Sequence, residues 1–235
     1  MKPTMALKPL VFALTALMAI AAQAHGGGGS TPPPTTPAPT SASATSNDGQ
    51  SNHGNVVLND KTKNNASVND SLNNYSGVVG NNTLSGDNNQ GKNDVAIGSG
   101  DADFVFATVN SAQSNSGNLV INGGTKNNAS VNDSGNYGSG IIQSTVASGT
   151  SNQGSNSTAI ASGNGNAGGA TVNAVQDVSG NLSVNLSSGH GWSTKPVTNN
   201  ASVNSSFNHA SGIVGSNTLS GSNNQAQNNV AVTRF

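Results

Sequence analysis

The stretch Asn64-Asn65-Ala66-Ser67-Val68-Asn69 recurs unchanged at residues 127–132 and 199–204. Each copy opens a 34-residue segment, and the three segments (64–97, 127–160 and 199–232) align with one another without a gap. Repetition at a fixed period is typical of stacked architectures, in which each repeat contacts only its neighbours. The sequence therefore predicts a regular stack rather than a globular domain built around one pocket.

The full period is longer than this segment. Gln50, Gln113 and Gln176 precede the three copies at equal intervals, which define a 63-residue period. This spacing gives a repeat frame that organises the chain beyond the best-matched segments. The frame predicts the following parts: a disordered arm rich in Gly, Pro, Thr and Ser at 25–49, repeat units at 50–97, 113–160 and 176–232, connectors at 98–112 and 161–175, an insert near 187–195 in the third unit, and a tail at 233–235.

Residues 1–24 have the pattern of a secretion signal. Lys2 and Lys8 give a positive start, residues 10–20 form an apolar run, and Ala22-Gln23-Ala24 is a small-x-small cleavage site. The run is shorter than the roughly 20 residues that a membrane-spanning helix needs. We therefore expect residues 1–24 to be a signal peptide and the mature chain to be exported, not an integral membrane protein.

The composition favours strands over helices and amide contacts over an apolar core. The chain has 38 Asn, 34 Ser and 30 Gly, and only 7% of its residues are charged. Such a chain cannot bury a large apolar core, but it can pair strands and stack amide side chains into ladders. The predicted fold class is all-β, a repetitive cross-β or β-solenoid-like stack of three units with a disordered N-terminal arm. Strands are expected at 55–59, 66–69, 78–79 and 95–97, with chain reversals at Ser76-Gly77 and Ser85-Gly86.

Stacking on this frame brings identical residues over one another. Asp70 would lie over Asp133 and Lys63 over Lys126, and because like charges that close repel, these positions should face solvent. Amide side chains in the same situation can form ladders along the stack. The predicted amide ladders are Asn64/Asn127/Asn199, Asn89/Asn152/Asn224, Gln90/Gln153/Gln225 and Asn93/Asn156/Asn228. The predicted apolar seams are Val68/Val131/Val203, Val79/Ile142/Val214 and Ile97/Ile160/Val232.

The sequence offers no pattern for catalysis, metal binding or nucleic-acid binding. His25, His53, His190 and His209 occupy non-equivalent repeat positions, without the spacing of a metal site. Past the leader, nine Asp face five Lys and one Arg, which leaves no basic stripe for nucleic acid. We therefore expect no cofactor, no metal, no nucleic-acid partner and no enzymatic activity.

The stretch from Ser76 to Asn93 resembles the FapC/FapB family of functional amyloids of pseudomonads. Their three imperfect repeats carry the signature Gly-Val-Asn-x-Ala-Ala-Gly-x-x-Asn-Gln-Gln-x-Asn. The matching residues are Gly80, Asn82, Gly86, Asn89, Gln90 and Asn93 in the first copy and Gly215, Asn217, Gly221, Asn224, Gln225 and Asn228 in the third. This chain departs from the signature at two places. Leu84-Ser85 replaces its Ala-Ala, and its second Gln is replaced by Gly91, Gly154 and Ala226 in the three copies.

The resemblance implies a structural subunit of an extracellular amyloid fibre that supports biofilm formation. It further implies export through an outer-membrane pore, and assembly with further copies and with related fibre subunits. The family has a major subunit, which usually ends with a Cys-x-x-Cys motif, and a minor, nucleating one. This chain has no cysteine, which, with its short uniform connectors, favours the minor type. The alternative is a monomeric β-helical surface adhesin or binding module, which should carry a capping element at one end of its stack.

Overall fold

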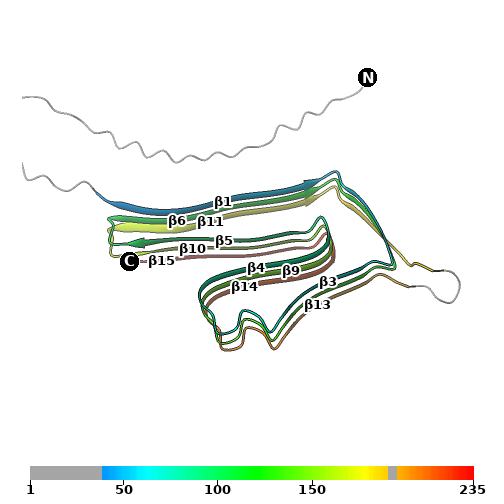
Figure 1. Ribbon diagram of the computed structural model, residues 1–235. Helices are drawn as coiled ribbons and strands as arrows, with labels where there is room; N and C mark the ends of the chain where they lie inside the picture. The colour runs from blue at the N-terminus through cyan, green and yellow to red at the C-terminus, as the bar shows by residue number, and fades with distance from the viewer. Residues whose placement is uncertain (1–38, 190–194) are drawn as a thin grey trace, which may run out of the picture. The chain divides into compact units, whose positions relative to one another are not determined.

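The computed structural model describes residues 39–189 and 195–235. The predicted signal peptide, arm residues 25–38 and insert residues 190–194, with Trp192, lie outside the described residues. The described part contains 15 strands in five sheets, each of three parallel strands (Figure 1). Within it, no helix is long and apolar enough to cross a membrane. The predicted all-β stack is confirmed.

Each third of the chain contributes five strands, which together form one layer of the stack. The first layer consists of β1 (Ser41–His53), β2 (Val56–Asp60), β3 (Lys63–Asn69), β4 (Ser76–Asp87) and β5 (Gln90–Gly100). The second consists of β6 (Phe104–Ser116), β7 (Leu119–Gly123), β8 (Lys126–Asn132), β9 (Ser139–Thr150) and β10 (Gln153–Gly163). The third consists of β11 (Ala167–Ser179), β12 (Leu182–Leu186), β13 (Thr198–Asn204), β14 (Ser211–Ser222) and β15 (Gln225–Arg234).

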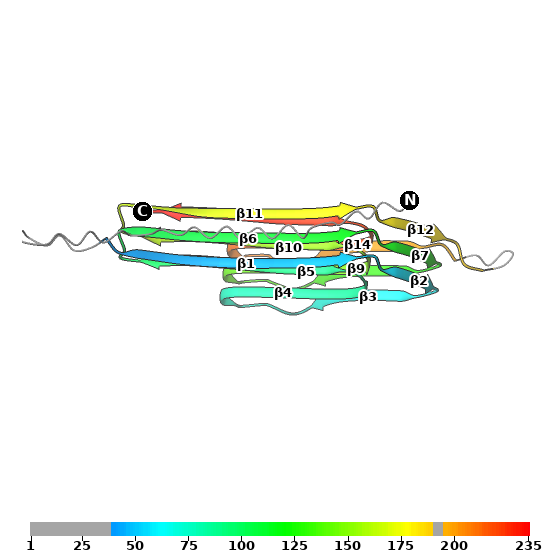
Figure 2. The ribbon, with the colours of Figure 1, turned by 90° about the horizontal axis from the view of Figure 1, so that it is seen from above.

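The layers stack in register on the repeat frame. Every sheet places the second-layer strand between its first- and third-layer equivalents (Figure 2). Lys63 pairs with Lys126, its equivalent one period later. After the insert the sequence offset between paired residues increases, and Asn127 pairs with Asn199. The insert therefore lengthens the chain at one corner without shifting the register of the strands that follow.

Strands occupy segments that the sequence predicted as arm and connectors. β1 begins within the arm, and β6 and β11 include most of the connector residues. In β6, Val105, Ala107 and Val109 are buried on alternate positions, which is the pattern of a strand with one inward face. The first-layer equivalents of these residues, Ala42, Ala44 and Ser46, are small and lie in a Ser- and Thr-rich segment that resembles a linker. The repeat unit therefore has strands where structureless connectors were expected.

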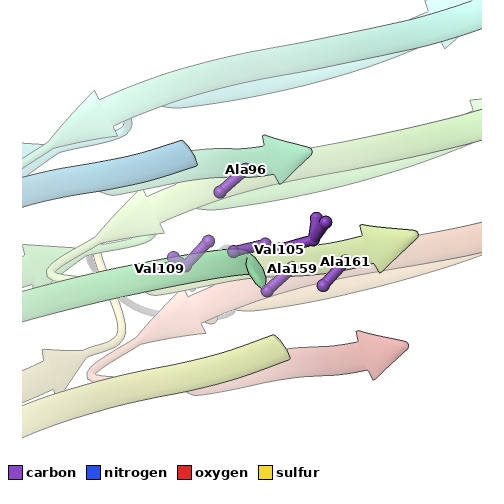
Figure 3. Packing of buried hydrophobic residues seen from close by; sticks show 6 residues of the cluster. Ala96, Val105, Val109, Ala159 and Ala161 are labelled. Carbon is purple, nitrogen blue, oxygen red and sulfur yellow. The ribbon is translucent and has the colours of Figure 1, made fainter. Parts of the chain in front are cut away.

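The chain folds inward within each layer. β1, β2 and β3 follow one another around the outside of the layer. The chain then turns back through β4 and β5, so that β5 lies between β1 and β4 (Figure 1). The larger apolar cluster fills the space between sheets β1-β6-β11 and β15-β10-β5 (Figure 3). Its members are Ala96, Val105, Ala107, Val109, Ala159 and Ala161. Their small size lets the two sheets approach closely, so the core is thin.

The predicted reversals at Ser76-Gly77 and Ser85-Gly86 are wrong. Both pairs lie inside β4, and the chain instead reverses at 70–75 and 88–89. Gly77, Gly140 and Gly212 form one column and share positive φ angles of 103°, 119° and 112°. A positive φ bends the strand without ending it, because the backbone amides still pair with the adjacent layers.

Replacing Gly140 by alanine should disrupt the stack. A Cβ at Gly140 would lie 2.1 Å from the carbonyl oxygen of Gly77, and the positive φ adds strain of about 1–3 kcal/mol. We expect Gly140→Ala to lower the free energy of unfolding by more than about 3 kcal/mol, measured by guanidinium chloride titration. Gly49→Ala is the matched control, because a Cβ there meets nothing within 4 Å. Equal stabilities of the two variants would contradict the close approach of layers at this column.

Candidate assembly surface

Three of the four predicted amide columns are joined by hydrogen bonds from side chain to side chain. Asn64 Nδ2 donates to Asn127 Oδ1 (2.9 Å), and Asn127 Nδ2 donates to Asn199 Oδ1 (2.8 Å). In the Gln90/Gln153/Gln225 column the donors point the other way along the stack: Gln153 Nε2 donates to Gln90 Oε1 (2.8 Å), and Gln225 Nε2 donates to Gln153 Oε1 (3.1 Å). An amide can donate and accept at once, so identical residues satisfy one another.

The Asn93/Asn156/Asn228 column also connects strands within the layers. Asn156 Nδ2 donates to Asn93 Oδ1 (2.9 Å) and to the carbonyl oxygen of Ser144 (3.1 Å). Its Oδ1 accepts from Asn228 Nδ2 (2.8 Å) and Asn217 Nδ2 (3.1 Å). Asn156 is buried, so its removal would leave several polar groups without partners and away from water.

Asn152 does not make the continuous side-chain ladder that was expected of it. It is buried in the turn between β9 and β10, outside the strands, and its backbone N–H, not its side chain, donates to Asn89 Oδ1 (3.0 Å). Its Nδ2 instead donates to the carbonyl oxygens of Ser148 (3.0 Å) and Gly221 (3.1 Å). Asn224 reaches the Asn152 side chain with two donors: its Nδ2 (3.0 Å) and its backbone N–H (3.3 Å) both donate to Asn152 Oδ1. The ladder prediction is therefore wrong for the Asn152–Asn89 step, because two backbone carbonyls take the donor hydrogens of Asn152.

Sequence reasoning missed further ladders of the same kind. The side chains of Gln50, Gln113 and Gln176 form a column with bonds of 2.8 and 2.7 Å. The regular spacing of these glutamines was the signal that could have found it. The other missed columns are Asn47/Asn110/Asn173, Asn59/Asn122/Asn185, Asn65/Asn128/Asn200 and Asn69/Asn132/Asn204.

The first two predicted apolar seams are buried in the middle layer but open in the third. Val131 and Ile142 are buried, because layers cover them above and below. Val203 is 48% exposed and Val214 is 39% exposed, so the prediction that they lie in a buried seam is wrong for this chain alone. No further layer of the chain covers the third layer, whereas Val68 in the opposite end layer is only 7% exposed, so the two ends are not equivalent.

The third predicted seam, Ile97/Ile160/Val232, faces outward. Ile160 is only half-buried, and Ile97 and Val232 are exposed. The inward position is taken by the neighbouring residue, Ala159, which is fully buried. Because successive residues of a strand point to opposite faces, Ala159 and Ile160 cannot both point inward.

The charged columns lie at the surface, with one exception. Lys63 stacks on Lys126 and both are exposed, as are Asp70 and Asp133. The exception is a partly buried ionic cluster in the first layer, in which Lys92 and Asp94 are buried and Asp48 is exposed. There Lys92 Nζ lies 3.5 Å from Asp48 Oδ2 and 3.4 Å from Asp94 Oδ2, and the Lys92 side chain is only 1% exposed.

Register places uncharged residues above this ionic cluster in both other layers. The equivalents of Asp48, Lys92 and Asp94 are Ser111, Ser155 and Ser157 in the second layer, and Ala174, Gln227 and Asn229 in the third. Burial raises the pKa of Asp94, while Lys92 and a hydrogen bond from Ser111 act to lower it. Among the described residues, no group of three or more His, Cys, Asp or Glu could hold a metal ion.

The two ends of the stack carry unpaired strands with complementary outlines. β5 contacts both β1 and β6, and β10 contacts both β6 and β11, whereas β15 contacts β11 but has no later strand to meet. The inner strands are thus offset from the outer ones by about half a layer. β1 therefore projects at the first-layer end and β15 at the third-layer end, which gives the two ends complementary outlines.

Comparisons with known proteins give the family of the chain. The sequence profile of the functional amyloid protein FapB/FapC family matches residues 43–234. The functional amyloid subunit FapC of Pseudomonas aeruginosa is 40% identical over 192 residues, covering 79% of this chain and 56% of that protein. The chain thus spans little more than half the length of this relative. No solved structure matches the chain.

The ladders at Asn156 and Asn128 differ mainly in burial. Asn128 makes the same two bonds along its column, at 2.8 and 2.9 Å, but on the outer face of the stack. We expect Asn156→Ala to reduce the free energy of unfolding by about 3 kcal/mol or more and Asn128→Ala by about 1 kcal/mol, by denaturant titration. A larger loss for Asn128→Ala would refute the importance of buried amide satisfaction.

Removing Lys92 alone should destabilise the chain more than removing all three residues of the ionic cluster together. Lys92→Ser leaves two carboxylates without their cation, and we expect a loss of about 3–5 kcal/mol in the free energy of unfolding. The triple variant Asp48→Ser, Lys92→Ser, Asp94→Ser copies the second layer and should regain most of that loss. Denaturant midpoints of the two variants provide the test, and a triple variant less stable than Lys92→Ser would argue against this register.

Proposed function

The chain belongs to the FapB/FapC functional amyloid family, and on that premise we propose that it is a secreted fibre subunit whose folded three-layer stacks join end to end. The family is structural, not enzymatic. The observation that carries the proposal is the pair of complementary ends, each with strands that lack a partner. Unpaired strand edges template the pairing of further chains, and register at the junction would continue every amide column from one chain into the next.

The composition of the end layers supports growth by addition. Third-layer Asn199, Gln225 and Asn228 are the end members of ladders whose first-layer members are the same residue types. A second copy stacked on this end would therefore make the side-chain hydrogen bonds that already join the layers within one chain. It would also cover Val203, which is left open at the third layer. At the third-layer end, β12, β13 and β14 contain no charged residue, which removes a usual barrier to edge-to-edge association there.

The cellular setting is part of the proposal. The leader predicted at residues 1–24 directs the chain out of the cytoplasm, and the family premise supports passage through an outer-membrane pore to an extracellular fibre that supports biofilm formation. Other Fap subunits are the expected partners. The absence of cysteine favours the minor, nucleating role, whereas the match to FapC favours the major one. Trace amounts of this chain, added to a purified major subunit, should abolish its lag phase if the role is nucleation.

The alternative, a monomeric β-helical adhesin or binding module, requires a cap on the stack. Across residues 39–189 and 195–235, no element covers the strand edges at either end. End-to-end polymerisation is therefore the function that the described structure favours.

A proline at Thr45 should block growth while leaving the chain folded. Phe104 N–H donates to Thr40 O (3.1 Å), and because alternate residues of a strand face the same neighbour, the Thr45 amide points away from the second layer. Thr45→Pro thus removes a donor only from the free end. We expect unchanged far-ultraviolet circular dichroism, at least a tenfold slower elongation, and termination of wild-type fibres by small amounts of the variant.

Thr108→Pro is the matched control, because Thr108 is in the same column but its amide points to the first layer. This variant should lose stability as a monomer, because proline removes an internal ladder bond. If Thr45→Pro elongates as fast as wild type, the first-layer edge is not the site of addition.

A further inference from the structure

The outer face of sheet β12-β7-β2 is aliphatic. Val56, Leu119 and Leu182 form one outward column, and Leu58, Ile121 and Val184 form the next. Val56 and Leu58 are each 75% exposed, and Leu182 is 58% exposed. We call these six residues the aliphatic stripe. They run along the stacking direction across all three layers, in the sheet at the corner of each layer (Figure 2).

The stripe is not part of the chain's own core. The alternate residues of the same strands point inward, and Val120 and Asn122 in the middle layer are buried. The outer faces of two other sheets carry Asn ladders instead. These ladders are Asn47/Asn110/Asn173 in sheet β1-β6-β11 and Asn65/Asn128/Asn200 in sheet β13-β8-β3. Other outward aliphatic residues exist, such as the Ile97/Ile160/Val232 column, but Val56 and Leu58 of the stripe are more exposed than any of them. A contiguous exposed aliphatic patch is typical of an interaction site.

The three strands that carry the stripe contain one charged residue, Asp60. Neither column contains a charged residue. Asp60 and Lys61 follow one another at the end of β2, and their side-chain charges lie 3.9 Å apart on the surface. A surface that binds anionic membranes carries a cluster of basic residues around its apolar face. Here the exposed Lys63 and Lys126 lie in the adjoining strands β3 and β8, and the charge at the edge of the stripe itself is one acid–base pair. Two copies related by a two-fold axis could bring Lys61 of one opposite Asp60 of the other, as a self-complementary interface requires.

We propose that the aliphatic stripe is the surface through which two stacks of this chain pair side by side. The inference depends on the end-to-end growth proposed above, since joined chains extend the stripe along the whole fibre. A second stack of the same chain has the same axial spacing of about 4.8 Å per layer. It can therefore cover the stripe layer by layer, with side chains interdigitating as in a dry interface between sheets.

The narrowness of the stripe makes the pairing depend on fibre length. One chain offers only two outward columns, each with one residue per layer, so two monomers bury little apolar area against each other. Successive chains in a fibre are tethered in register, so their contacts add without a new association cost for each. Paired stacks should therefore form after elongation, while monomers stay single.

Mass per length of unstained fibres, measured by scanning transmission electron microscopy, tests the pairing. A single stack holds one chain in each three-layer repeat of about 14 Å, and a paired stack holds two. We expect two chains per repeat for wild type. The variant with all six stripe residues changed to threonine should form fibres of one chain per repeat, because threonine keeps the strand propensity and removes aliphatic area.

The control changes Thr45, Thr108 and Thr171 to serine on the outer face of another sheet, and it should keep two chains per repeat. Wild-type fibres of one chain per repeat, or six-threonine fibres of two, would overturn the pairing and leave end-to-end growth intact. Failure of wild type to form fibres would instead overturn the proposed function.

A single charge gives a second test that does not depend on the six-residue variant folding. Leu58→Lys places like charges opposite each other once per chain, and screening weakens their repulsion. We expect single stacks at 20 mM salt and paired stacks at 1 M salt. If Leu58→Lys fibres have the same number of chains per repeat at both salt concentrations, the contact does not run through Leu58.

If wild-type fibres have one chain per repeat but bind uncharged phosphatidylcholine vesicles, and the six-threonine fibres do not, the occupant is lipid and the pairing proposal fails.

Discussion

The hydrogen bond between identical amide side chains of adjacent layers is the interaction on which the rest of the stack depends. Asn and Gln each carry a donor and an acceptor, so a column of one residue type can satisfy itself for any number of layers. Carboxylates and ammonium groups cannot do this, which is why stacked charges such as Lys63 and Lys126 stay in solvent. The same property makes the fold extensible, because a column ends with one donor or acceptor unused at each end.

Where the layers differ in sequence, they compensate one another locally. The partly buried ionic cluster of the first layer lies beside serine hydroxyls of the second. In the loop at 133–138, the rings of Tyr75 and Phe207 lie where Cβ atoms at Gly138 and Gly135 would be. Aromatic side chains of the outer layers thus occupy the room that glycines leave in the middle layer. These contacts distinguish the layers, whereas the ladders alone would allow any layer to stack on any other.

The repeat frame made much of the structure predictable from sequence. Residues one period apart do lie over one another, and the predicted amide residues form four columns, of which only the one through Asn152 departs from a continuous side-chain ladder. The path of the chain within a layer was harder to predict from the sequence. Glycine after serine resembles a turn, but at Gly77 and Gly86 a positive φ bends a strand that continues. Alternation in β1 is hidden because its inward residues include Ala42, Ala44 and Ser46, and Ile97 points outward because the neighbouring Ala96 takes the buried position.

The central claim is that the layers stacked in register belong to one chain. Because the sequence has no cysteine, nitroxide labels can be attached at Asn65→Cys and Asn128→Cys, which replace outward-facing partners in adjacent layers. Electron paramagnetic resonance of fibres with the doubly labelled chain diluted twentyfold into unlabelled chain is the direct measurement. The account predicts strong spin coupling at about 5 Å that persists on dilution. Coupling that disappears on dilution would show that neighbouring layers come from different chains, and would contradict the three-layer fold.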